Sequence, residues 1–515
     1  MAPEDLERAS RDELIDLVLA ANTRLDEVEG QLRWFKKQLF GAKSERRIDL
    51  VPDPSQLHLG EGHAAKAAPE RPSRVVRAHT RRQRTPREDG NESGLRFDDS
   101  VPVTRIVIPN PELEGIADDE LIEIDERVTH QLAQQPASYV VIETVRHVVK
   151  RRDTGEITCP PAPPMVLEKS YADVSLLAGM LVDKFRYHLP LYRQHQRMKA
   201  AGITVSRASL TNWVHRTAQL LEPIYQAQVA SVRGSTVPAM DETPIRAGRK
   251  AKGKMRTAYF WPIYGDRDEV IFPYASSRAH LHVEAFLGEF EGTLLTDGYG
   301  AYPAYAEQRA KVEHALCWAH TRRGFVKAED VEPDRVARAL DFIGQLYEIE
   351  SEIREKERVG EAKLQVRGDR SRQVVAELFE WLKEDLAQSV LLPRNPFTVA
   401  ANYALERRRG LEVFLADPDV PIDTNHLERT LRPIPMGRKS WLFCWTELGA
   451  ERVGQVQSLI TTCVLQGVDP YTYLVDVLQR IATHPSARVE ELTPRLWKEH
   501  FADAPMRSVL HDRPA

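Results

Sequence analysis

The run STVPAMDET at residues 235–243 opens the segment of this 515-residue chain that determines its fold. Two more strand-like runs follow it, KMRTAYFWPIYG (254–265) and DEVIFPYAS (268–276), both rich in β-branched and aromatic residues. The segment continues with one helix-like run and two further strand-like runs: RAHLHVEAFLGEF (278–290), GTLLTDGYGAY (292–302) and KVEHALCWAH (311–320). Three adjacent strands, a helix and two more strands predict an α/β sheet of mixed strand direction.

Three acids in or near this sheet are candidates for catalysis. Asp241 ends the apolar run VPAM, Asp297 ends GTLLT, and Glu428 lies early in a predicted helix, DTNHLERTLRP. An acid at the end of a buried strand costs free energy unless it is paired or binds a cation. Three carboxylates can hold two Mg²⁺ ions about 3.5–4 Å apart, which is the arrangement for phosphodiester cleavage and transfer.

Spacing alone leaves other interpretations of these acids open. Glu428 and Arg432 are four residues apart, which is also the spacing of a surface ion pair on a helix. Asp297 and Gly298 together are equally typical of a turn. The competing carboxylates nearby are Glu242, Asp266, Asp268 and Glu313.

A helical, acidic segment interrupts the sheet. Residues 329–411 read as helices, and residues 329–385 carry sixteen acids and ten bases, a net charge of −6. The sheet domain resumes near Asp423 and ends in a long helix around ERVGQVQSLITTCVLQG. The pattern predicts a helical insertion, whose charge favours a packing or protein-contact role over phosphate binding.

A positively charged element precedes the sheet. Residues 184–221 contain seven Lys or Arg and no acid, and MKAAGITVSRASLTNWVHRTAQLL within them is typical of a helix-turn-helix with Gly202 in the turn and Ser206 as N-cap. Arginine and asparagine on a recognition helix can bond base edges in the major groove. A purely structural helical bundle is the alternative. The residues expected on the exposed face are Arg207, Ser209, Asn212 and Arg216.

The N-terminal third has three parts. Leu14 to Leu39 follow an a/d pattern for almost four heptads, which indicates a self-associating coiled coil or an amphipathic helix packed on its own domain. Residues 41–99 lack periodicity and hold seven Arg between 71 and 87, so they are interpreted as a disordered basic linker for a phosphate backbone or as a solvated tail. VTRIVIP and YVVIETVRHVVKR then predict strands, with eight acids at 111–126 between them.

Composition excludes several classes of protein. No apolar run approaches the roughly 18 residues that span a bilayer, and the N-terminus lacks a signal-peptide pattern. Four Cys without a CxxC pair exclude a disulfide framework and fit a reducing cytosol. The net charge of −5 argues against a nucleic-acid partner only as an average, because acidic segments offset the acid-free +7 of 184–221 and +4 of 429–446.

The order of several motifs resembles one known family. TVPAMDETP, LLTDGYGAY, HALCWAHTRRGF, NHLERTLRPIPMGRKSWLF and SLITTCVLQGVDPYTYL, together with HLPLYRQHQRMKAAGITVSRASLTNWV and WFKKQLFGAKSER, are similar to motifs of the insertion-sequence-66 family of bacterial transposases. The resemblance implies a retroviral-integrase-like (RNase H-like) core with a DDE triad and a helical insertion between its second Asp and its Glu. The matching positions are Asp241, Asp297 and Glu428.

The chain departs from that family in one module. Family members usually carry two Cys pairs before the helix-turn-helix, which form a small zinc site. Here the corresponding stretch lacks them, and Cys159 alone cannot make a four-ligand site. We therefore predict no structural zinc and a metal-free β module.

Smaller motifs near the triad have two interpretations each. His314, Cys317 and His320 follow at a spacing of three, but a Cys among apolar residues is usually core. Trp441 is suited either to stack on an unpaired base or to pack in the core. The candidates for contact with DNA phosphates are His320, Arg322, Arg323, Arg429, Arg432, Arg438 and Lys439.

Together these features predict a multidomain α+β protein. Its predicted parts are a coiled-coil helix (1–48), a basic disordered linker (49–99), a small β module (100–165), a helix-turn-helix DNA-binding domain (166–232), an RNase H-like core (233–328 and 412–468), a helical insertion (329–411) and a C-terminal helical tail (469–515).

The predicted function is that of a DNA transposase that binds terminal inverted repeats and catalyses metal-dependent cleavage and strand transfer. The metal is expected to be two Mg²⁺ ions, with Mn²⁺ able to replace them, held by the triad. Expected partners are double-stranded DNA of the ends and target, further copies of the chain and accessory proteins of the same element, without a membrane, in the bacterial cytoplasm on the nucleoid. The alternatives are a catalytically inactive, transposase-derived DNA-binding regulator and an RNase H-like nuclease without strand transfer.

Overall fold

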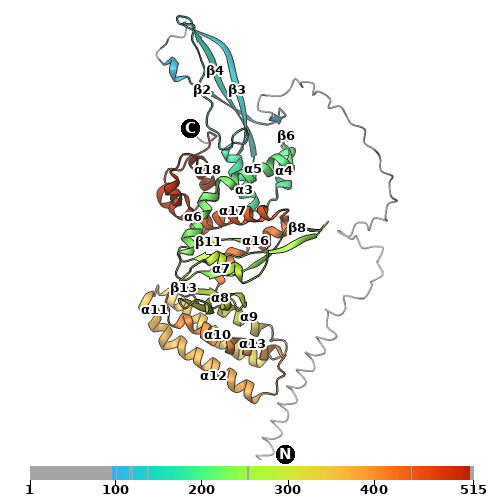
Figure 1. Cartoon of the computed structure of the whole chain (residues 1–515), viewed down its shortest axis with the longest axis vertical. Coiled ribbons are helices and arrows are strands. Elements are labelled where there is room, and N and C mark those ends of the chain that lie inside the picture. Colours follow the sequence, from blue (N-terminus) through green and yellow to red (C-terminus); the bar gives the residue numbers. More distant parts are fainter. Residues whose placement is uncertain are drawn as a thin grey trace, which may run out of the picture.

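The computed structural model describes residues 95–510 except for 100, 115, 117–119, 136–137, 252–253 and 442–443. The predicted coiled coil and most of the predicted basic linker lie outside these residues. Along the long axis of the molecule, a β module at one end is followed by a helical domain, a central sheet and, at the other end, a bundle of helices (Figure 1). No helix in the described part is both long and apolar enough to cross a membrane.

The central sheet has five strands in the order β11-β10-β7-β13-β14. The first three strands along the chain form an antiparallel meander, and the last two join it in parallel beside β7. This mixed sheet is the one predicted from the sequence. Its strands are β7 (Ala239–Met240), β10 (Ile263–Gly265), β11 (Glu269–Ile271), β13 (Gly292–Thr296) and β14 (Val312–Leu316).

Each of the three runs predicted as single strands is divided into two. The second and third runs break at Trp261-Pro262 and at Phe272-Pro273, because proline has no N–H to donate to a ladder, whereas the first breaks after Met240, at Asp241-Glu242. Beyond the breaks, the same runs form a second sheet in the order β12-β9-β8. Its strands are β8 (Thr243–Ala251), β9 (Lys254–Phe260) and β12 (Tyr274–Ala275).

A long helix, α17 (Glu447–Leu465), covers the edge strand β11. Its Ser458 and Thr462 hydroxyls accept hydrogen bonds from the backbone N–H groups of Phe272 and Val270, at 2.9 and 3.1 Å. These side chains satisfy edge donors that a buried sheet would otherwise leave unpaired. Short helices α7 (Leu281–Leu287) and α8 (Ala301–Glu307) contribute to a second apolar cluster of the core.

The predicted insertion is helical, as expected. A fully buried Arg367 joins it to the returning chain, because it pairs with Glu350 and donates to the carbonyl oxygen atoms of Phe414, Asp417 and Val420. The helices of the insertion are α10 (Pro333–Glu355), α11 (Gly360–Val366), α12 (Arg372–Gln388), α13 (Pro396–Glu406) and α14 (Arg408–Glu412).

The β module contains one strand that was not predicted from the sequence. The acidic stretch was expected to lie between two strands, but it runs directly into β3 (Leu121–Gln135), which pairs with β4 (Ser138–Arg151) over its whole length. Alternating Ile and acidic residues at its start are typical of a half-exposed strand. β2 (Val103–Ile108) lies parallel to β4 on the other side.

The helical domain agrees with the predicted turn and cap. Helices α4 (Leu191–Ala200) and α5 (Arg207–Leu220) are joined at Gly202, whose φ of +79° favours glycine. The Ser206 side chain accepts a hydrogen bond from the N–H of Ser209 at 3.0 Å, as an N-cap does. The neighbouring helices are α3 (Val174–Phe185), α6 (Glu222–Arg233), α18 (Pro470–Arg480) and α19 (Pro494–His500).

Candidate catalytic site

Two of the predicted catalytic acids leave neighbouring parallel strands at the same edge. Asp241 follows β7, Asp297 follows β13, and the two strands are paired through Ala239 and Leu295. The carboxyl ends of parallel neighbours meet at one edge of a sheet, so the two side chains converge. Together with Glu242 they form a group whose carboxylate oxygen atoms lie within 4.8 Å of one another.

Glu242 appeared in the sequence only as a competing carboxylate. Consecutive residues of a regular strand point to opposite faces, but Asp241 and Glu242 lie in the break between β7 and β8 and both reach the group. The Glu242 side chain is 3% exposed and accepts hydrogen bonds from Arg278 Nε at 2.7 Å and Tyr302 Oη at 2.5 Å. These partners come from a loop and from α8, so no local pattern in the sequence indicates the contact.

The third predicted acid, Glu428, lies in the first turn of α15 (Asn425–Leu431). Its partner is Arg323 of α9 (Trp318–Val326), at 2.9 Å, rather than Arg432 one helical turn away. His320 Nε2 lies 3.6 Å from the same carboxylate. The Glu428 charge makes the smallest of the named contributions to the raised pKa of Asp241.

Burial changes the protonation of this site. Burial of Asp241, followed by repulsion from the Glu242 carboxylate, raises the pKa of Asp241 to about 7. Burial likewise raises the pKa of Glu242, although Arg278 and Tyr302 oppose the shift, and it lowers the pKa of His320. A buried carboxyl group with a pKa near neutrality beside other carboxylates is typical of functional sites.

This shift predicts that the Asp241→Asn variant is more stable than the wild type above pH 7. The folded protein binds a proton at Asp241 between pH 4 and about 7 that the unfolded chain does not, so wild-type stability falls as pH rises through that window. A shift of about 3 units corresponds to at most about 4 kcal/mol. Urea midpoints in EDTA at pH 4.5 and pH 8 measure it. Equal effects at both pH values, or the same gain in the exposed-acid control Glu313→Gln, would contradict it.

A cleft of about 510 Å³ opens beside Asp297. The core contributes Tyr299, His320 and Arg323 to its walls, and the helical insertion contributes Val399 and Tyr403 from α13. The Arg278 guanidinium lies 3.6 Å above the ring of Tyr299. The cleft therefore combines acids, cations and aromatic faces, and the insertion forms one of its walls.

The donor set fits a hard divalent cation. Asp241, Glu242 and Asp297 offer only carboxylate oxygen atoms, which Mg²⁺ prefers, and burial together with the neighbouring carboxylates raises the pKa of Asp241. His314 and Cys317 take no part in this group. His314 Nε2 lies 2.8 Å from the Thr296 hydroxyl, and the Cys317 sulfur atom accepts hydrogen bonds from Thr424.

Comparison with known families decides the assignment. The model described as "Transposase IS66 family" matches residues 169–452, and the "IS66 C-terminal element" matches residues 458–495. The chain belongs to the IS66 family of transposases. A third model, "Transposase C of IS166 homeodomain", matches residues 27–106, so the resemblance noted from the motifs is confirmed.

Three relatives of this IS66 transposase come from Sinorhizobium fredii (strain NBRC 101917 / NGR234) and are called uncharacterized proteins. The protein y4hP is 31% identical over 92% of this chain and 89% of its own length. The protein y4jD is 30% identical over 96% of this chain and 97% of its own length. The protein y4qI is 29% identical over 92% of this chain and 89% of its own length.

Residues predicted to contact DNA in this transposase occupy different environments. On α5, Arg207 and Asn212 are exposed, whereas Ser209 is half-buried against the Ser206 cap and the half-buried Arg216 donates to the carbonyl of Glu168. The α5 face available to a ligand is thus narrower than predicted.

The predicted DNA-contacting cations near Glu428 also differ in their exposure. Arg322, Arg429, Arg432 and Lys439 are exposed, while Arg438 donates to the carbonyl of Pro244. Trp441 is half-buried and packs against the main core cluster, which favours the packing interpretation over stacking on a base.

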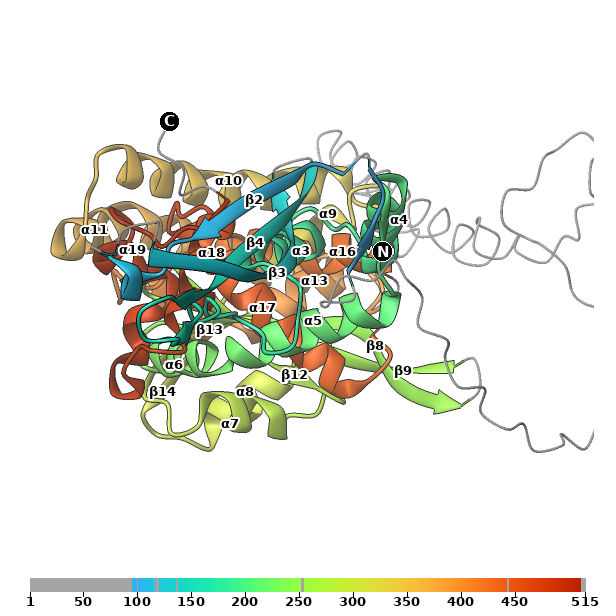
Figure 2. The same ribbon diagram turned by 90° about the horizontal axis from the view of Figure 1, so that it is seen from above.

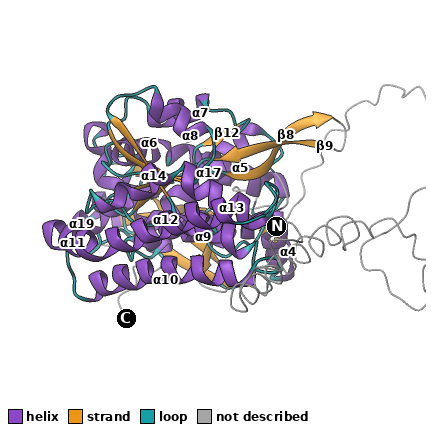
Figure 3. Ribbon diagram, turned by 90° about the horizontal axis from the view of Figure 1, so that it is seen from below, coloured by secondary structure: helices purple, strands orange, loops and turns teal. Residues whose placement is uncertain are grey.

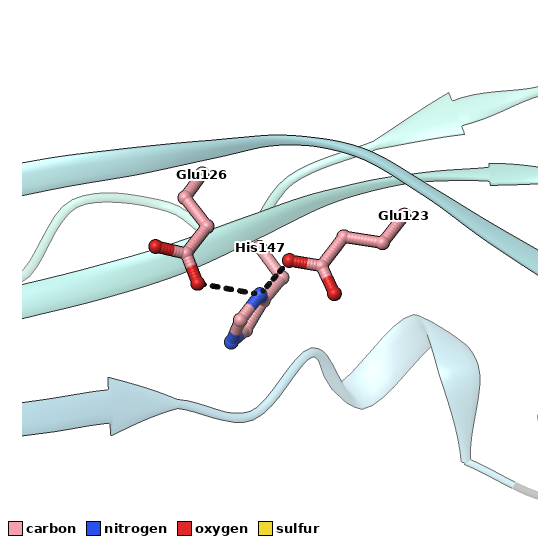
Figure 4. A group of neighbouring side chains, drawn as sticks. All are labelled: Glu123, Glu126 and His147. Atoms are coloured by element: carbon pink, nitrogen blue, oxygen red, sulfur yellow. Dashed lines mark hydrogen bonds and ion pairs between the residues drawn. The ribbon is translucent and has the colours of Figure 1, made fainter.

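A second group of possible metal ligands lies on the β module (Figure 4). His147 Nδ1 lies 2.7 Å from Glu123 and 3.6 Å from Glu126, and Glu126 also pairs with Arg105 at 2.9 Å. These ion pairs account for the grouping. The absence of a structural zinc, expected from the missing Cys pairs, stays a prediction.

Proposed function

We propose that this IS66-family protein is a DDE transposase with an RNase H-like core. The observation that carries the proposal is the convergence of Asp241, Glu242 and Asp297 at one edge of a mixed sheet, beside a cleft lined by Arg278 and by Arg323, which pairs with Glu428. The strand order, with an antiparallel meander extended by two parallel strands, supports the core assignment. We assign the same division into domains that the sequence predicts.

The proposed reaction is hydrolysis at the element ends, followed by attack of the freed 3′-hydroxyl on target DNA. Asp241, Asp297 and Glu428 would hold Mg²⁺, which when bound supplies activation of the attacking oxygen and stabilisation of the leaving oxygen. Arg278 and Tyr302 fix the Glu242 carboxylate, so that Glu242 orients the metal-binding edge. Arg323 holds Glu428 and presents its remaining N–H groups to the scissile strand.

One assay tests this function and separates it from its alternatives. Purified full-length protein is incubated with Mg²⁺ or Mn²⁺, DNA carrying the element ends, and a target plasmid. Joined products support a transposase. Cleavage without joining would indicate a nuclease, and end binding without cleavage would indicate a regulator.

We further propose that α5 reads the terminal inverted repeats. The exposed Arg207 and Asn212 at its N-terminal half are suited to base edges in the major groove. In this proposal, residues 14–39 mediate self-association, accessory proteins of the element assist, and the reaction takes place on the chromosome in the bacterial cytoplasm.

Replacing Asn212 by alanine is expected to weaken binding to end DNA by about 1–3 kcal/mol while leaving binding to unrelated DNA nearly unchanged. The reason is that an amide bonded to a base edge discriminates sequence, whereas phosphate contacts do not. Electrophoretic mobility shifts with end and scrambled duplexes measure the ratio of the two binding affinities. Gln219→Ala, at an exposed position near the end of the same helix, serves as control. An equal loss on both duplexes would argue against base reading.

A further inference from the structure

The hairpin of β8 and β9 carries a charge that its role in the sheet does not explain. Residues 244–257, PIRAGRKAKGKMRT, contain six Lys or Arg and no acid. Only its last four residues, KMRT, belong to a strand predicted from the sequence. Its charge per residue exceeds that of residues 184–221, the segment expected to bind DNA.

The hairpin projects from the body of the protein. Figures 2 and 3 show β8 and β9 reaching past the neighbouring helices as a two-stranded ribbon. Ile245, Ala247 and Ala258 are buried in the main core cluster, so the ribbon is packed into the core as far as Ala247. The cationic side chains of the described part are all exposed: Arg246, Arg249, Lys250, Lys254 and Arg256.

A bulge distributes these cations over both faces of the ribbon. Arg246 pairs with Thr257 and Arg249 with Met255, so one residue, Gly248, is extra on β8. Its φ of +68° favours glycine, and the bulge brings Arg249 to the face that Arg246 occupies. Arg256, opposite Ala247, lies on the other face. On that face Arg256 pairs with Glu447 at 3.5 Å, so the positive charge is concentrated on the face that Arg246 and Arg249 share.

The ribbon is held firmly to the catalytic edge. β8 begins two residues after Asp241, and at its middle the N–H of Cys444 donates to the Arg246 carbonyl at 2.8 Å while the N–H of Gly248 donates to the Cys444 carbonyl at 3.2 Å. Trp445, next in the chain, is 63% exposed and lies under the Arg249 guanidinium at 5.9 Å. The segment 429–446 is also free of acids, and it contacts the ribbon at Cys444 and through Arg438, which donates to the Pro244 carbonyl.

We propose that the β8–β9 hairpin is a DNA-binding arm that lies on duplex DNA next to the cleaved strand and contacts its phosphates without reading sequence. A two-stranded ribbon fits the major groove of B-DNA, and the cations on the face of Arg246 and Arg249 match its phosphates. The inference rests on the proposed transposase function and adds a contact to it. An acidic surface of a second copy of the chain is the other possible occupant, and the experiment separates the two.

The test is the salt dependence of binding to an unrelated duplex of about 30 bp by full-length protein. The variant is the triple replacement Arg249→Gln, Lys250→Gln and Lys254→Gln. Each lost phosphate contact removes about 0.9 from the slope of log affinity against log salt, so we expect a slope shallower by about 2–3 and weaker binding to all sequences alike. The matched control removes three exposed cations of the insertion, Arg354→Gln, Lys356→Gln and Lys383→Gln, and is expected to retain the wild-type slope.

Two further measurements make the result decisive. The charge-conserving variant Lys250→Arg with Lys254→Arg should retain the wild-type slope. If the triple variant fails to fold, the single variant Lys250→Gln takes its place and should reduce the slope by about one. An unchanged slope in a folded triple variant overturns the inference. It is also overturned if the triple variant sediments as a monomer while its DNA binding stays intact, because the hairpin would then bind a second copy of the chain. Strand transfer by the wild type tests the proposed function separately, because the arm can fail while joining persists.

Discussion

Replacement of Asp241 by asparagine is expected to lower cleavage and strand transfer by about 10³-fold or more, while end binding stays within about twofold of the wild type. Asparagine keeps the volume and the hydrogen bond from the Glu242 N–H but removes the negative charge that a divalent cation requires. Asp297→Asn and Glu428→Gln are expected to act alike, because Asp297 belongs to the same carboxylate group and Glu428 is the third acid of the proposed triad. Single-turnover assays on end-containing DNA measure the loss.

The controls for this result use the same structure. Glu313→Gln removes an exposed acid of the neighbouring strand β14 and is expected to retain full activity. The gain in stability expected for Asp241→Asn above pH 7 shows that its inactivity does not come from unfolding. Full joining activity in the Asp241 variant would remove this residue from the catalytic assignment.

Replacement of Arg367 by methionine is expected to destabilise the protein by about 3–5 kcal/mol. Arg367 is 0% exposed and forms a bidentate pair with Glu350 at 2.7 and 2.8 Å. The substitution leaves a buried, unpaired carboxylate and removes the donor of three backbone carbonyl groups. Urea unfolding monitored by Trp fluorescence reports the change.

A double variant distinguishes the charge from the packing. Arg367→Met combined with Glu350→Met removes both charges, so we expect it to recover part of the loss of the single variant. The orphaned carbonyl groups of residues 414–420 remain in both, and this segment leads to Asp423 and α15, so Glu428 should lose its fixed position and strand transfer should fall in parallel. If the single and double variants are equally stable, the buried charge is not the source of the cost.

Local patterns in the sequence predicted much of this fold. Helical periodicity predicted the inserted helices, and Gly202 with Ser206 predicted the turn and cap of α5, because caps and positive φ depend on neighbouring residues only. Asp241 and Asp297 were recognisable as acids that end apolar strands. Acid and Ile alternation at the start of β3 was a local signal too, but the high charge density hid it.

The sequence by itself therefore determined the family, the mixed sheet with its helical insertion, and the three candidate acids. Each of these follows from local residue patterns and from the order of the motifs along the chain. The tertiary structure alone decided what those acids meet: Glu242 beside Asp241, Arg323 on Glu428, and α13 on the wall of the cleft. It also decided that the basic run after Asp241 projects as a ribbon. These contacts join residues up to about a hundred positions apart, and their free energy depends on burial and on distances between charges, which a linear pattern does not encode.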